Sequence, residues 1–167
     1  MEAVRWTFLV ATAGARFHLR TVTSYFLPDD DLLSARSAAA LRGGTVDLFL
    51  PAENNVGSLW LATQTELPAL IQTGVRVWIC PPPFSQPKRM VVDDDWVMFV
   101  SAYWDARCLR LSSERNVESY DVEWVQQAIE AMDSYSEGAE RLLKPGTDEA
   151  WAKTLAGRAM RLMRPFL

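Results

Sequence analysis

One stretch in the second half of the chain carries several side chains that bind or react with anions. It contains Gln86, Lys88, Asp93, Ser101 and Glu114. Residues at i and i+2 of an extended chain face the same side, so Gln86 and Lys88 can reach one ligand. Lysine supplies a point charge for a phosphate, and carboxamide and hydroxyl groups donate hydrogen bonds to its oxygens. The stretch therefore indicates a site for a phosphate group.

This stretch resembles the signature of the phospholipase D superfamily, and more widely the second half of a bacterial cardiolipin synthase. The superfamily signature is His-x-Lys-x4-Asp, followed by Gly-Ser-x-Asn and a later carboxylate. Lys88, Asp93, Ser101 and Glu114 fit this signature, whereas the His, Gly and Asn positions hold Gln86, Val100 and Tyr103. The wider resemblance rests on RWTFL, VTSYFLPD, PPPF, MVVDD, SAYWDARCLRL and NVESYD. Val100 and Tyr103 are bulkier than the family residues, so both could fill the phosphate pocket.

The resemblance implies a site shared between two such halves. In the family, the His of one half attacks phosphorus to form a phosphohistidine, and the His of the other half protonates the leaving alcohol. Each Lys holds phosphate oxygens, and neither a metal nor another cofactor is needed. Gln86 cannot be this nucleophile, because a carboxamide is neutral and attacks phosphorus very poorly. We therefore expect a half domain whose catalysis is impaired, unless a partner chain supplies histidines.

The remaining motif residues have a structural as well as a functional interpretation. Lys88 is either a phosphate ligand or a solvated surface lysine, and its register with Asp93 and Ser101 favours the ligand. The family resemblance implies that Asp93 mainly stabilises structure near the site, and we prefer that role. Glu114 matches a carboxylate that orients the catalytic His. Without that His, Glu114 could pair with Lys88 or Arg107 instead.

The elements that position this stretch alternate between helices and strands. Hydrophobic spacing predicts a helix over 3–15, a strand over 17–23, a helix to residue 41, a strand over 45–50, a helix over 57–72 and a strand over 75–80. This order predicts parallel strands joined by helical crossovers. Further on, the pattern predicts strands over 88–92, 96–101 and 115–120, an acidic turn over 93–95, and a helix over 122–132. We expect an α/β fold: a single phospholipase D-like half domain with a mixed, mostly parallel central sheet flanked by helices on both faces.

Residue types also predict the ends of the second helix. Asp29, Asp30 and Asp31 are typical of an N-cap and an acidic first turn. Gly43 and Gly44 are typical of a glycine C-cap.

The chain changes character after residue 134. We divide it into a half domain over 1–134, with its signature region over 81–114, and a C-terminal helical extension over 135–167. Residues 147–165 form a predicted helix with Trp151, Leu155 and Leu162 on one face. This helix either packs on the domain or lies at an anionic membrane surface, since it also carries several basic residues.

Bulk composition narrows the classes of function. The 167 residues suit one domain, and the net charge of −4 argues against a nucleic-acid partner. We expect a homo-oligomer or a complementary phospholipase D-like half as partner, with a phospholipid or another phosphodiester as ligand. No apolar run reaches the ~20 residues that cross a bilayer. We therefore expect a chain that is either cytoplasmic or peripheral at the inner membrane.

Overall fold

The computed structural model describes residues 3–52, 57–83, 88–101, 104–105 and 116–143. Its helices are α1 (Ala3–Gly14), α2 (Asp30–Leu41), α3 (Gly57–Gln72) and α5 (Val122–Ser136). Its longer strands are β1 (His18–Val22), β3 (Thr45–Pro51), β4 (Arg76–Cys80), β5 (Arg89–Val92), β6 (Trp96–Val100) and β8 (Asn116–Ser119). Its shortest strands are β2 (Phe26–Leu27), β7 (Trp104–Asp105) and β9 (Glu140–Arg141).

Seven strands form one sheet in the order β8-β6-β5-β1-β3-β4-β9, and β2 pairs with β7 separately. β1, β3 and β4 are parallel neighbours, as the alternating helices and strands predict. The other four pairings within the seven-stranded sheet are antiparallel. The mixed α/β fold is therefore confirmed, but the expectation of a mostly parallel sheet is wrong. One of these pairings has a local reason, because β5 and β6 are joined by a tight turn, which permits only antiparallel pairing. The other three pair strands that are farther apart in the sequence.

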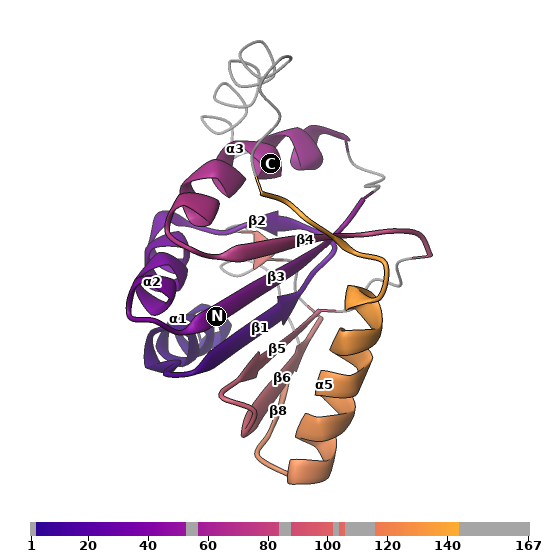
Figure 1. Cartoon of the computed structure of the whole chain (residues 1–167). Coiled ribbons are helices and arrows are strands. Elements are labelled where there is room, and N and C mark those ends of the chain that lie inside the picture. Colours follow the sequence, from indigo (N-terminus) through magenta and orange to yellow (C-terminus); the bar gives the residue numbers. More distant parts are fainter. Residues whose placement is uncertain (1–2, 53–56, 84–87, 102–103, 106–115, 144–167) are drawn as a thin grey trace.

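Helices cover both faces of this sheet (Figure 1). α1, α2 and α3 pack on one face through buried residues that include Phe8, Leu32 and Leu67. α5 packs on the opposite face through Val125, Ala128, Ile129 and Met132. Side chains alternate along β6, so Met98 packs against the layer of α1, α2 and α3, and Val97 packs against α5.

The predicted ends of α2 are confirmed. The side chain of Asp29 accepts a hydrogen bond from the backbone N–H of Leu32 at 3.1 Å, which is an N-cap contact. Gly43 follows the helix with a φ of 95°, a conformation that strains residues with a Cβ. The N–H of Gly44 donates to the carbonyl oxygen of Ala39 at 3.1 Å, which closes the helix end.

The acidic turn between β5 and β6 is confirmed as well. Asp93 and Asp94 both have positive φ, 53° and 59°, and the N–H of Asp95 donates to the carbonyl oxygen of Val92 at 3.2 Å. Two central residues with positive φ are typical of a hairpin turn whose twist matches the strands it joins.

The segment after residue 134 contributes one strand to the sheet. β9 pairs antiparallel with the outer edge of β4, with Arg141 opposite Trp78. The sequence analysis predicts a helical extension here and no strand, because two residues are too few to give a periodic pattern. The predicted helix over 147–165 lies outside the described residues. Along the part of the chain that is described, none of the helices has the length and apolar character needed to cross a membrane.

Candidate functional site

Lys88 and Ser101 lie on neighbouring strands at one edge of the seven-stranded sheet. Lys88 directly precedes β5, and Ser101 directly follows β6. These two ends meet because the strands are antiparallel, and the N–H of Val100 donates to the carbonyl oxygen of Lys88 at 2.9 Å. Lys88 is half-buried and Ser101 is exposed. The structure therefore brings two of the predicted phosphate ligands together.

The carboxyl ends of the parallel strands lie at this same edge. Val22 of β1 is opposite Arg89, so the next residue, Thr23, lies beside Lys88. The N–H of Thr23 donates to the carbonyl oxygen of Phe49 at 3.3 Å, and its hydroxyl donates to the carbonyl oxygen of Tyr25 at 2.8 Å. Open α/β sheets bind ligands outside the carboxyl ends of their parallel strands. This edge is therefore the candidate site.

Three predicted site positions lie outside the described residues: Gln86, Tyr103 and Glu114. Val100, which replaces the family's glycine, is described. It is buried and packs in the core on the α1–α2–α3 side of the sheet. Its side chain is thus part of the apolar layer beneath the edge that carries Lys88.

Asp93 lies at the opposite end of β5 from Lys88. Its carboxylate accepts hydrogen bonds from the backbone N–H groups of Arg16 at 2.9 Å, Phe17 at 2.7 Å and His18 at 2.9 Å. Partial burial by itself raises the pKa of Asp93, but these hydrogen bonds outweigh it and hold that pKa below its ordinary value. The contacts fix the start of β1 to the β5–β6 turn, which is a structural role.

His18, the single histidine of the chain, also lies at this far end. Its ring Nδ1 is 3.0 Å from the Oδ2 of Asp94. The register places Thr23 beside Lys88 and His18 beside Asp93, so His18 and Lys88 are five strand positions apart. At about 3.3 Å per residue, this corresponds to ~16 Å. His18 therefore cannot serve as the nucleophile next to Lys88 of the same chain.

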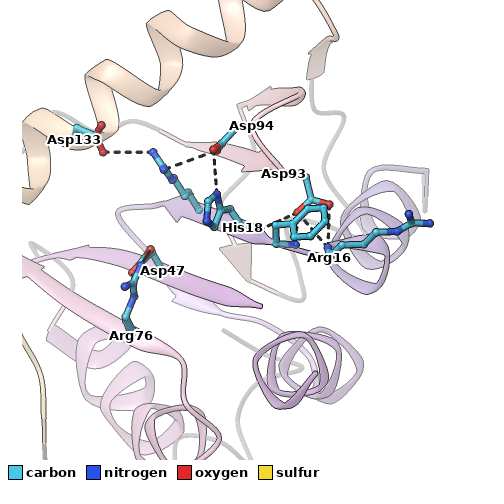
Figure 2. Close-up of polar contacts among 9 residues, drawn as sticks. Arg16, His18, Asp47, Arg76, Asp93, Asp94 and Asp133 are labelled. Carbon is cyan, nitrogen blue, oxygen red and sulfur yellow. Dashed lines mark hydrogen bonds and ion pairs between the residues drawn. The ribbon is translucent and has the colours of Figure 1, made fainter. Parts of the chain in front are cut away.

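Charged side chains connect the strands on the α5 side of the sheet (Figure 2). Arg20 lies 3.8 Å from the carboxylate of Asp94 and 3.4 Å from that of Asp133 on α5. On the neighbouring strands, the carboxylate of Asp47 accepts hydrogen bonds from Arg76 and, at 2.7 Å, from the indole N–H of Trp78. Each of these acids lies against a base. One group of contacts connects β1 to the hairpin turn and to α5, and the other connects β3 to β4.

The sequence analysis missed a buried arginine below the candidate site. Arg36 of α2 is fully buried, and its Nη1 donates to the hydroxyl of Thr21 at 3.2 Å. Its guanidinium also lies over the ring of Phe26 at 5.5 Å. Burial lowers the pKa of Arg36 to about 9. The available signal was its spacing, because Leu32, Arg36 and Ala39 fall on the buried stripe of α2.

Metal-binding side chains do not cluster in the described part of the chain. No group of three or more His, Cys, Asp or Glu residues there is arranged to hold an ion. The acidic residues of the β5–β6 turn instead contact backbone N–H groups, His18 and Arg20.

Comparison with known sequences identifies the family. The sequence profile described as "Cardiolipin synthase, PLD-like domain" matches residues 11–135, which is most of the chain. The chain belongs to this family. It is 28% identical to cardiolipin synthase 2 of Bacillus anthracis over 167 residues, which cover 99% of the chain and 32% of the relative. It is 30% identical to cardiolipin synthase 2 of Bacillus cereus over 129 residues, or 77% of the chain and 25% of the relative.

A solved structure supports the same fold. The phospholipase D family member Nuc from Salmonella typhimurium superposes with a TM-score of 0.72, at 19% identity, over 83% of this chain and 90% of Nuc. The phospholipase D-like chain described here thus spans nearly all of Nuc but only a quarter to a third of the two cardiolipin synthases. Its length is that of one phospholipase D-like half.

Proposed function

We propose that this chain is a cardiolipin synthase-related half domain whose own catalysis is impaired. The observation that carries the proposal is that the single histidine of the chain does not lie beside Lys88. Gln86 stands at the position where the family resemblance implies the attacking His. The single histidine, His18, is about 16 Å away by strand geometry and contacts Asp94.

Phosphate binding is the part of the family chemistry that the chain retains in this proposal. Lys88 and Ser101 lie at the same sheet edge and combine a cation with a hydroxyl donor. Such groups bind the oxygens of a phosphodiester without needing a metal. The proposed ligand class is therefore a phospholipid headgroup or another phosphodiester, bound without turnover by the isolated chain.

An activity assay tests the impairment. The purified chain is incubated with phosphatidylglycerol vesicles, and cardiolipin and released glycerol are measured for the wild type, Lys88→Ala and Arg141→Ala. Arg141 is an exposed cation on β9, remote from Lys88 along the sheet, and serves as the matched control. We expect all three chains to give only the background signal. Rapid turnover that is lost in Lys88→Ala but kept in Arg141→Ala would overturn the proposal.

A second candidate is an active phosphatidyltransferase or phosphodiesterase completed by a partner chain. It is favoured by length, because this chain spans only 32% and 25% of the two cardiolipin synthases described above. The partner would supply the histidines from an intact signature, and this chain would contribute Lys88. Co-expression with such a half distinguishes the two candidates. Activity that needs both chains and Lys88 supports completion, whereas activity independent of Lys88 does not.

A third candidate is a non-enzymatic interaction module, which would associate with a partner through the face that two halves share in the family. A separate proposal concerns where the protein acts. In this proposal the segment over 147–167 holds the chain at the surface of the inner membrane. Its support is the combination of Trp151 and Leu155 with Lys153, Arg158 and Arg161 in one predicted helix. A membrane contact would bring the chain to lipid headgroups whether or not it has catalytic activity.

A further inference from the structure

The outer surface of the α1–α2 layer carries very little charge. Both helices are described along their whole length, and each contains one arginine. Arg5 is buried against Asp29 and Asp31, and Arg36 is fully buried. Between the helix ends, the exposed side chains are uncharged; the most prominent are Trp6, Val10, Ala13, Ser34, Ala38 and Leu41. These six residues are called the α1–α2 face.

The helix on the other side of the sheet provides a comparison. The exposed side of α5 carries Glu123, Glu130 and Asp133, as expected of a solvated helix. α5 also exposes Val122 and Trp124, but acidic residues lie along the same exposed side. The α1–α2 face leaves Trp6 50%, Val10 67% and Leu41 72% exposed, with no exposed charge between the helix ends. Solvated protein surfaces are about 25–35% charged, whereas the centres of protein interfaces are depleted in charge. The α1–α2 face therefore has the composition of an interface.

α1 and α2 lie side by side (Figure 1). Contacts at both ends show that they run in the same direction. At their first turns, Arg5 of α1 pairs with Asp29 and Asp31 of α2. At their last turns, Arg42 donates to the carbonyl oxygen of Ala13 at 2.9 Å. The α1–α2 face therefore has two well-defined ends, one at the helix starts and one at the helix ends.

These two ends carry opposite charges. Asp30 and Asp31 are exposed where the helices start, and Arg16 and Arg42 are exposed where they end. Asp93 also lies near Arg16, because its carboxylate accepts hydrogen bonds from the backbone N–H groups of Arg16, Phe17 and His18. Its negative charge offsets one of the two arginines at this end. The acidic and basic ends are about 16 Å apart along the helix axis, at 1.5 Å per residue.

We propose that the α1–α2 face binds a second copy of this chain through a two-fold axis perpendicular to the helices. Such an axis makes the helices of the two copies antiparallel. The acidic end of one copy, with Asp30 and Asp31, then lies opposite the basic end of the other, with Arg16 and Arg42. Two-fold symmetry repeats this contact at the other end of the interface. The antiparallel helix dipoles also attract one another. The small residues Ala13, Ser34 and Ala38 let the two helix layers approach closely, with Val10 near the centre.

A membrane fits this surface less well than a second copy does. Asp30 and Asp31 at one end repel an anionic bilayer, and alanine and serine contribute little apolar area for insertion. The inference does not depend on the lipid chemistry proposed above, since the face lies on the helix layer and not at the edge that carries Lys88.

Sedimentation equilibrium over a wide range of concentration tests the proposal with the full chain. We expect a dimer in the wild type, and at least a tenfold rise in the dissociation constant, about 1.4 kcal/mol, for Val10→Asp. Val122→Asp is the control, because Val122 is 74% exposed at the start of α5. It should dimerise like the wild type. A monomeric wild type, or self-association that Val10→Asp leaves unchanged, overturns the proposal.

A charge swap tests the antiparallel arrangement and does not rely on a change in the apolar face. Arg16→Glu and Asp30→Arg each place like charges opposite one another across the two-fold axis, so each should weaken the dimer several-fold. The double variant restores opposite charges and should return close to the wild-type dissociation constant. If the losses in dimerisation free energy of the two single variants simply add in the double variant, the antiparallel arrangement is wrong. Circular dichroism of each variant confirms that the fold is retained.

Discussion

Asp93 and His18 are joined by two hydrogen bonds. The N–H of Asp93 donates to the carbonyl oxygen of His18 at 2.8 Å, and the N–H of His18 donates to the Asp93 carboxylate at 2.9 Å. Together they attach the start of β1 to the end of β5. An aspartate of the phospholipase D-like signature is thereby used to hold two strands together, about 16 Å from Lys88 by strand spacing.

Replacing Asp93 should therefore cost stability. Asp93→Ala removes a carboxylate that accepts hydrogen bonds from the N–H groups of Arg16, Phe17 and His18. We expect the free energy of unfolding to fall by about 2 kcal/mol, measured by chemical denaturation. Asp95→Ala is the control, because Asp95 is exposed in the same turn, and its change should stay within about 0.5 kcal/mol. Equal effects of the two substitutions would contradict the structural role.

The lowered pKa of Asp93 also predicts a dependence of stability on pH. In the unfolded chain the carboxyl group of Asp93 binds a proton near pH 4, whereas in the folded chain it stays ionised to lower pH. The contribution of Asp93 is thus fully present above pH 5 and is lost as pH falls from there through the folded pKa. In Asp93→Asn this contribution is absent. Unfolding curves at several acidic pH values should show the wild type and Asp93→Asn converging in stability. A constant gap between them would contradict this prediction.

Arg36 should be among the most sensitive positions of α2. Arg36→Ala leaves a cavity beside Phe26 and removes the hydrogen bond to the Thr21 hydroxyl. We expect a loss of about 3–4 kcal/mol in the free energy of unfolding. Arg36→Met fills more of the volume and should lose less. Arg141→Ala, at an exposed arginine, should have almost no effect. If Arg36→Ala is as mild as Arg141→Ala, the guanidinium is not part of the core.

Restoring the nucleophile alone should recover little activity. Gln86→His supplies an imidazole, but Val100 and Tyr103 still replace the smaller family residues. The triple variant Gln86→His, Val100→Gly, Tyr103→Asn should release more product from phosphatidylglycerol than Gln86→His does. The matching control adds Lys88→Ala to the triple variant and should abolish the gain. A large gain from Gln86→His alone would show that the rest of the site is intact.

The C-terminal segment should control any membrane binding. We expect the full chain to float with anionic vesicles at low salt, since each Lys or Arg near such a surface contributes about 1 kcal/mol. A chain ending at Lys144 should stay in the aqueous fraction, and neutral vesicles should bind neither chain. The proposal of a membrane-binding helix is wrong if the shortened chain floats equally well, or if neither chain binds anionic vesicles.

Local chemistry was sufficient to predict many elements of this fold. Asp29 and Gly43 mark the ends of α2 because capping depends on a few adjacent residues. The turn at Asp93 and Asp94, and the parallel β1, β3 and β4, follow from short-range pattern and from alternating helices. The quoted motifs also indicated the family that the sequence profile identifies.

Tertiary structure decided what local pattern could not. The antiparallel majority of the sheet, and the pairing of β9 with β4, depend on contacts between residues far apart in the chain. The burial of Arg36 depends on how α2 packs, because a helix stripe alone does not exclude a cation. The distance between Lys88 and His18 depends on strand register. Sequence determined which chemical groups are present, and strand pairing determined which of them meet, because pairing is a long-range property of the folded chain.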